Sequence, residues 1–143
     1  MLLSETVPFK VFVSRASVDK NHERVQHTIE LLLQYQVNIY IAENDYQCGG
    51  KLTAKVKSNL STSTVVIAFL TSNGVKSAWV QQEIGFAKAL NKPVFILYDD
   101  TKVKETGEYF GMCFDEEGCK LSDAEGMSNL LVRIIKSNPK YEK

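Results

Sequence analysis

The sequence predicts an α/β protein in which helices cover both faces of a parallel sheet of four to five strands. Short apolar runs alternate with segments of helical spacing along the chain, and this order requires crossover connections that leave neighbouring strands parallel. Residues 65–70 are apolar throughout, which is typical of a strand covered on both faces. We therefore expect residues 65–70 to form the centre of the sheet.

The elements before this central strand follow from spacing and from breakers. Residues 11–13 form a short buried strand, and residues 22–36 repeat apolar side chains at helical intervals after a predicted N-cap at Asp19. A second strand at residues 37–41 precedes a polar, glycine-containing loop at 43–51. A short helix at residues 52–60 then leads into the central strand.

The elements after the central strand continue the alternation. A helix carrying Trp79 and Glu83 comes first, and the next strand places its proline at the first position, where no ladder donor is lost. The closing helix turns Leu130, Leu131 and Ile134 inward together with Ile135. The predicted ranges are a strand at 93–98, a fifth, edge strand at 109–114, a helix at 123–136 and a loose tail at 137–143.

Length, charge and cysteine content limit the class of protein. The 143 residues fit one domain, 1–143, and 17 basic against 17 acidic residues leave no basic run, which excludes nucleic acid as the main partner. The chain has three cysteines, Cys48, Cys113 and Cys119. This odd and sparse set argues against the disulfide framework of a small secreted protein, so we expect the protein in the reducing cytoplasm. No apolar run approaches the roughly 20 residues that span a bilayer, so we expect no membrane association.

The most informative segment is Ser77–Gly85, because it places a carboxylate one helical turn beyond the single tryptophan. Residues four apart share a helix face, so Glu83 and Trp79 should lie on one stripe that continues to Phe86 and Leu90. A carboxylate beside an aromatic wall is common where a protein grips a sugar or poises an acid. The alternative is a half-exposed Glu83 whose stem packs on the indole.

The carboxyl ends of parallel strands are where loops converge on ligands. Three segments should therefore line one cleft: Ser14–Ser17, residues 43–50, and Thr71 onwards to Ser77 and Trp79. Each segment also has a purely structural interpretation. The serines can end a strand or start a helix, and Gly49–Gly50 can simply provide a turn.

Other chemistries of α/β proteins do not fit. The loop after the first strand contains no glycine, which excludes a dinucleotide-binding Rossmann site, and the strand ends lack the acidic residues of a phospho-accepting receiver. No phosphate-binding glycine-rich loop is present. The cysteines with His22 and His27 lack zinc-site spacing, so we expect no metal, and the histidines are expected on a solvated helix face.

Three segments resemble Toll/interleukin-1 receptor (TIR) domains. Residues 11–20 look like the first conserved box of that family, with a strand that ends in Ser and runs into Ser-x-Asp-Lys. Residues 37–45 resemble its second strand and the loop that follows. Residues 77–87 with 91–94 are similar to the third box of the bacterial and archaeal branch. The resemblance covers residues 9–98.

The resemblance implies a flavodoxin-like three-layer sandwich and cleavage of NAD between nicotinamide and ribose. NAD would be the substrate, with no further cofactor. Glu83 aligns with the catalytic glutamate of the family and Trp79 with an aromatic that lines the nucleotide cleft. Arg15 stands where many relatives carry His or Tyr. The other positions that align with segments around the nucleotide are Ser14, Asp45 and Tyr46, and Ser77 at the rim of the predicted cleft is the remaining candidate for substrate binding.

The resemblance also implies partners. TIR catalysis tends to need self-association that orders the loop after the second strand, which here contains Tyr46 and Gly49–Gly50. A sensor and an effector would then be separate proteins, in a defence setting. Two alternatives stay open: a signalling adaptor without chemistry, in which Glu83 is incidental, and an enzyme like the nucleoside deoxyribosyltransferases, which share the architecture and also use a carboxylate on ribose.

Overall fold

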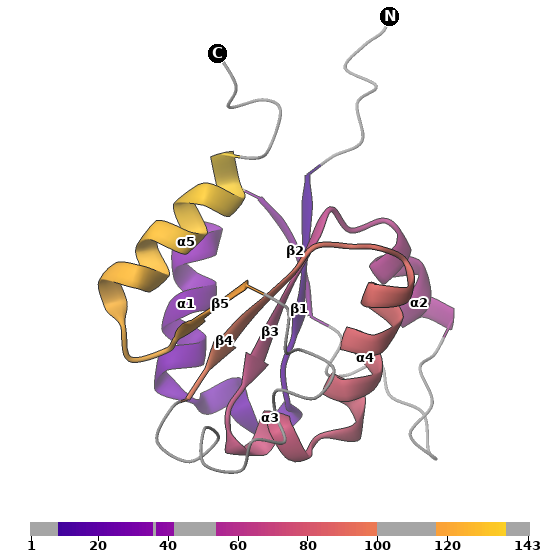
Figure 1. Ribbon diagram of the computed structural model, residues 1–143, viewed down its shortest axis with the longest axis horizontal. Coiled ribbons are helices and arrows are strands. Elements are labelled where there is room, and N and C mark those ends of the chain that lie inside the picture. The colour runs from indigo at the N-terminus through magenta and orange to yellow at the C-terminus, as the bar shows by residue number, and fades with distance from the viewer. Residues whose placement is uncertain (1–8, 36, 42–53, 100–116, 137–143) are drawn as a thin grey trace, which may run out of the picture.

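A five-stranded parallel sheet lies between two pairs of helices (Figure 1). The computed structural model describes residues 9–35, 37–41, 54–99 and 117–136. The strands are β1 (Lys10–Ser14), β2 (Asn38–Ile41), β3 (Val65–Leu70), β4 (Val94–Tyr98) and β5 (Glu117–Lys120), in the order β2-β1-β3-β4-β5. All neighbouring strands pair in parallel, and β3 is central with every residue buried. The predicted sheet and its centre are confirmed.

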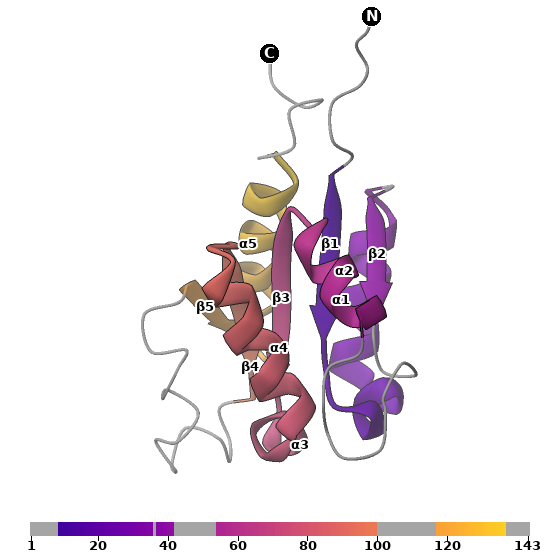
Figure 2. The same cartoon turned by 90° about the vertical axis from the view of Figure 1, so that its right-hand side faces the viewer.

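The helices form the outer layers of a three-layer sandwich (Figures 1 and 2). One face of the sheet is covered by α1 (Glu23–Leu33) and α5 (Ala124–Lys136), and the other by α2 (Ala54–Ser61) and α4 (Ala78–Ala89). A 3₁₀ helix, η2 (Ser17–Asn21), follows β1, and a short helix, α3 (Ser72–Lys76), follows β3. None of the described helices has the length and apolar character needed to cross a membrane.

Alternation along β1 directs its side chains into two separate cores. Val11 and Val13 pack in the cluster under α1 and α5, whereas Phe12 packs in the cluster under α2 and α4. By the same alternation, Ser14 points toward the face that α4 covers. The residue that ends β1 is thereby brought against a helix more than sixty positions further along the chain.

The predicted N-cap of the first long helix is wrong, although the helix begins close to the predicted residue 22. Asp19 does not cap it; it lies inside η2, 1% exposed, and the N-cap of α1 is His22, whose Nδ1 accepts from the Val25 amide at 3.4 Å. The helix is also shorter than the predicted 22–36, because it ends at Leu33. Hydrogen bonds from Thr71 and Asn73 to the carboxylate of Asp19 hold this residue inside η2 instead.

Residues 72–76 form a helix where the sequence indicated a loop. The hydroxyl of Thr71 accepts from the Gly74 amide at 2.9 Å and caps this short helix. A Cβ at Gly74 would clash with the carbonyl oxygen of Phe69. Gly74 is therefore required because the backbone of α3 folds directly back onto the end of β3.

The C-terminal elements agree with the prediction in kind. The edge strand is β5, formed by Glu117–Lys120, whereas the predicted range 109–114 lies outside the described residues, as does the tail 137–143. The predicted helix at 52–60 appears as α2, and the one at 123–136 as α5. The side chains of α5 that were expected to face inward are all buried: Leu130, Leu131, Ile134 and Ile135.

Candidate active site

Helix α4 presents an acidic side chain to the sheet in an otherwise apolar row. The buried residues of α4 are Val80, Glu83, Ile84 and Ala87. The helix begins at Ser77, whose hydroxyl accepts from the Val80 amide at 3.2 Å. Asn91, at φ 60°, adopts the left-handed conformation just beyond its C-terminal end. Glu83 is therefore fixed on a helix with defined ends rather than on a loop.

Glu83 bonds to the last residue of β1. The Ser14 hydroxyl donates to Glu83 Oε1 at 2.5 Å, and the exposed fractions are 0% for Ser14 and 2% for Glu83. The alternative of a half-exposed carboxylate is wrong, because the carboxyl group is enclosed between α4 and the sheet. A buried carboxyl costs free energy unless it is hydrogen-bonded, and Ser14 supplies such a bond.

The surroundings of Glu83 shift its pKa toward neutral pH. Burial raises the pKa of Glu83 to about 7, and the hydrogen bond from Ser14 opposes part of that increase by favouring the ionised form. Both protonation states are therefore populated at neutral pH. A carboxyl group of this kind can hold a positive charge when it is ionised, or donate a proton when it is neutral.

The aromatic stripe expected beside Glu83 is only partly present. Trp79 and Phe86 are half-buried, and Leu90, at the C-cap, is 37% exposed. The face that packs on the sheet is the row of Val80 and Ala87 that contains Glu83. Trp79 thus lies one turn before Glu83 on the flank of this row, and Leu90 lies just beyond the last helical residue, Ala89.

Segments that follow β1 and β3 are joined by a cluster that spacing did not reveal. Thr71 Oγ1 donates to Asp19 Oδ2 at 2.5 Å, and Asn73 Nδ2 donates to Asp19 Oδ1 at 3.0 Å. Asp19 and Thr71 are both buried. The signal available in the sequence was the placement of polar residues after two strands that turn out to be neighbours. This cluster ties η2, which follows β1, to the start of α3, which follows β3.

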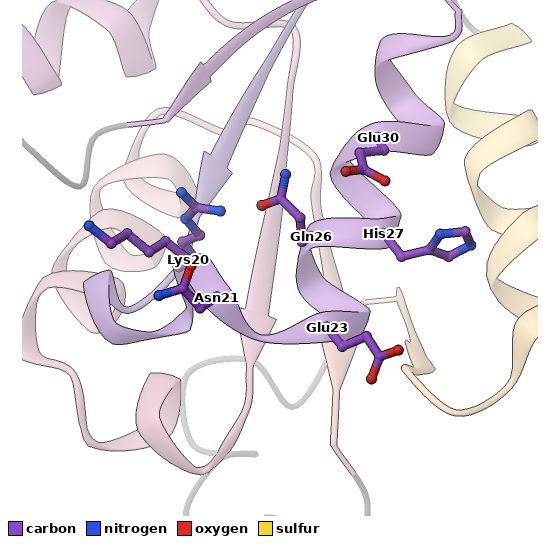
Figure 3. Close-up of a pocket in the computed structure, with 7 residues that line it drawn as sticks. Lys20, Asn21, Glu23, Gln26, His27 and Glu30 are labelled. Carbon is purple, nitrogen blue, oxygen red and sulfur yellow. The ribbon is translucent and has the colours of Figure 1, made fainter.

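Arg15 borders a separate hollow on the α1 side of the sheet (Figure 3). Its side chain is 7% exposed. In Figure 3, Gln26 extends from α1 toward Lys20 and Asn21, while His27 points away toward α5. The hollow has a volume of about 670 Å³, and its described lining is Arg15, Lys20, Asn21, Glu23, Gln26, His27 and Glu30. Of the predicted site residues that the structure describes, only Arg15 borders it.

The remaining candidates are residues of the predicted loop, the cysteines and the histidines. Asp45 and Tyr46, together with Cys48 and Cys113, lie outside the described residues. Cys119 is a free, half-buried thiol on β5. His27 is exposed on α1. Within the described ranges, no group of three or more His, Cys, Asp or Glu side chains is arranged to hold a metal ion.

The architecture defines a flavodoxin-like α/β domain that encloses a carboxyl group behind the end of its first strand. The chain belongs to the TIR domain family, because residues 11–117 match the model of the TIR domain. A comparison with curated proteins found no match. The assignment to the bacterial and archaeal branch stays a prediction.

Two solved structures share the fold. The TIR domains in the structure of the activated Roq1 resistosome directly recognising the pathogen effector XopQ superpose with a TM-score of 0.65 at 16% identity, covering 90% of this chain and 98% of that chain. The CMP N-glycosidase BcmB of Clostridium botulinum superposes with a TM-score of 0.55 at 18% identity, covering 87% of this chain and 98% of that chain. At these identities the likeness shows the fold alone.

Proposed function

We propose that this TIR domain cleaves NAD at the bond between nicotinamide and ribose, with Glu83 as the catalytic carboxylate. The observation that carries the proposal is the burial of Glu83 on the apolar face of α4, against the end of β1. An ionisable group at such a position lowers stability, and proteins retain groups of this kind mainly where they act. The products are nicotinamide and either ADP-ribose or a cyclic isomer.

One carboxylate suffices for this reaction. Nicotinamide leaves a cationic ring as a neutral molecule, so its departure needs no proton donor and builds positive charge on the ribose. A carboxylate held beside the ribose stabilises that oxocarbenium-like state. The ionised form of Glu83 is the active one, and the cationic ring of bound NAD favours this form by lowering the pKa of Glu83.

The other assignments extend the same proposal. Trp79 offers a flat face to the base or ribose, and Arg15 offers a charge to the pyrophosphate. The remaining candidates belong to segments that would surround the nucleotide: Ser77, Asp45 and Tyr46. We also propose that copies of this chain associate through the loop after the second strand, and that a separate sensor or effector completes defence signalling in the cytoplasm.

Two other functions compete with NAD cleavage. The shared fold of the CMP N-glycosidase favours hydrolysis of the same type of bond in a nucleotide or deoxynucleoside, with Glu83 in the same role. A signalling adaptor would bind NAD without turnover or not at all. Turnover of CMP or deoxynucleosides while NAD stays intact would support the first, and binding without products the second.

The decisive experiment is chromatography of the products from NAD with wild type and Glu83→Gln, at low and at high protein concentration. Removing one preorganised electrostatic group of this kind lowers kcat by about 100- to 1,000-fold. Glu125→Gln is the matched control, because it makes the same chemical change at an exposed position on α5. Intact NAD with both dilute and assembled wild type, or equal rates for wild type and Glu83→Gln, would contradict the proposal.

A further inference from the structure

We propose that Ser14 is a positioning residue, whose hydroxyl aims the carboxylate of Glu83 and sets the pH range in which that carboxylate works. The kinetic part of this inference rests on the proposed function, while the structural part concerns Glu83 alone. The sequence placed Ser14 among residues around the nucleotide. The geometry points to a role that is exerted through Glu83 instead.

Ser14 is buried at the end of β1, against Glu83. It is the last residue of β1, and its backbone pairs in register with Ala68 of the central strand. Its exposed fraction is 0%, and its hydroxyl donates to Glu83 Oε1 at 2.5 Å. The hydroxyl is therefore shielded from solvent and engaged with Glu83.

The bond acts on one oxygen of the carboxyl group. When Oε1 is fixed by Ser14, the rotation of the group is restricted and Oε2 takes a defined direction. Positioning of this kind is effective because both partners are carried by regular elements, β1 and α4, rather than by loops. In this arrangement Oε2 is the oxygen that meets the ribose.

The bond also acts on the protonation of Glu83. Burial raises the pKa of Glu83, and the Ser14 hydrogen bond lowers it. The other ionisable side chains described on α4 and on the elements packed against it are Lys10 of β1, Lys55 and Lys57 of α2, Lys76 of α3, Lys88 of α4 and Tyr98 of β4, and the adjoining segments add Arg15, Asp19, Lys92 and Asp99.

The test compares Ser14→Ala with Ser14→Thr, which keeps a hydroxyl, and with Ser63→Ala. Ser63 is the matched control, because it is 2% exposed and its hydroxyl donates to the Asn59 carbonyl oxygen. Ser63→Ala therefore removes the hydrogen bond of another buried serine, away from Glu83. Each variant is made with and without Glu83→Gln. The difference in unfolding free energy within each pair, followed against pH without substrate, gives the ionisation midpoint of Glu83.

We expect the Ser14→Ala midpoint to move up by about one pH unit, since a hydrogen bond to a charged group is lost. Ser14→Thr and Ser63→Ala should keep the wild-type midpoint, and the pH profile of kcat/KM for NAD should move with the midpoint. If Ser14→Ala does not fold, Ser14→Cys replaces it, because a thiol fills the space but donates weakly.

The outcomes separate the two proposals. A midpoint that stays in place in Ser14→Ala or Ser14→Cys overturns the positioning role, whether or not NAD is cleaved. A midpoint that moves equally in Ser63→Ala also overturns it, since the effect is then not local. A midpoint that moves in Ser14→Ala alone, in a protein that leaves NAD intact, supports the positioning role and contradicts NAD cleavage.

Discussion

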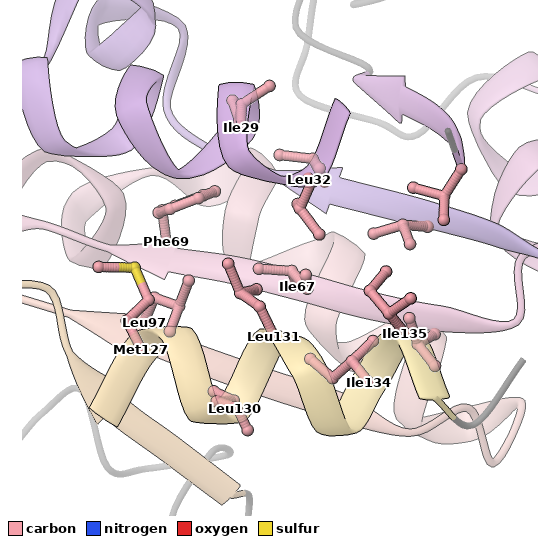
Figure 4. Packing of buried hydrophobic residues seen from close by; sticks show 14 of the residues in the cluster. Ile29, Leu32, Ile67, Phe69, Leu97, Met127, Leu130, Leu131, Ile134 and Ile135 are labelled. Carbon is pink, nitrogen blue, oxygen red and sulfur yellow. The ribbon is translucent and has the colours of Figure 1, made fainter. Parts of the chain in front are cut away.

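The two faces of the sheet differ in the buried side chains that their described helices contribute. Under α1 and α5 the core is a cluster of aliphatic and aromatic side chains in which Phe69 of β3 and Leu131 of α5 take part (Figure 4). The one buried polar residue described on these helices, Thr28, is uncharged, and its hydroxyl donates to the Arg24 carbonyl oxygen at 2.8 Å. Under α2 and α4 the helix row includes an ionisable group, Glu83.

This difference separates an apolar supporting face from the face that carries the candidate site. Apolar burial stabilises without conditions of pH, so the α1 and α5 face provides a rigid support for the strands. The α4 face gives up part of that stability where Glu83 lies, because the carboxyl group loses its hydration. The rest of its row, Val80, Ile84 and Ala87, is fully buried and offsets the loss.

The largest stability effect should come from the supporting face. Leu131→Ala removes a side chain that is 2% exposed and should lower the free energy of unfolding by about 2–5 kcal/mol. Chemical denaturation measures this change. NAD cleavage per folded molecule should stay at the wild-type level, because Leu131 packs on the opposite side of the sheet from Glu83. A specific activity that falls further than the folded fraction would break the division between the faces.

The next effect should come from the α4 face and should depend on pH. Glu83 has a raised pKa in the folded state, so the folded protein binds more protons than the unfolded chain between the ordinary pKa of 4.5 and about 7. The stability contributed by neutral Glu83 is therefore present below 4.5 and lost as pH rises through 7.

Glu83→Gln should accordingly be more stable than wild type by up to about 3 kcal/mol near pH 8. The difference should shrink toward low pH, where both side chains are neutral. Denaturant titrations of the two proteins across this range give the measurement, and Glu125→Gln, exposed on α5, serves as control. A difference that does not change with pH would show that the carboxyl group titrates as it does in water.

Local patterns predicted the supporting face better than the site. The apolar run at 65–70 and the helical spacing of α5 are properties of neighbours in sequence, and both appear as predicted. Asp19 carries the local features of a helix cap, yet Thr71 and Asn73 hold it inside η2. These contacts depend on how β1 and β3 pair, which no local window contains.

The site was predicted in part for the same reason. Spacing and family resemblance both selected Glu83, but its bond to Ser14 spans sixty-nine positions and follows only from the packing of α4 on β1. The predicted stripe continued from Phe86 to Leu90 by a four-residue step, whereas the helix ends at Ala89 and Leu90 is its exposed C-cap. Arg15 borders a hollow near α1, and its place beside the substrate stays a prediction.

The smallest effect concerns Ser77, which the sequence predicted at the rim of the substrate cleft and which lies at the N-cap of α4. Loss of a capping hydroxyl costs about 1 kcal/mol, so Ser77→Ala should lower the free energy of unfolding by that amount, as measured by denaturation. Ser77→Asn keeps an oxygen that can cap and should restore most of it. If capping is the only role, the KM for NAD stays constant in both variants. A KM that rises in both, including the one with restored stability, would instead place Ser77 in contact with substrate and extend the site from Glu83 to the start of its helix.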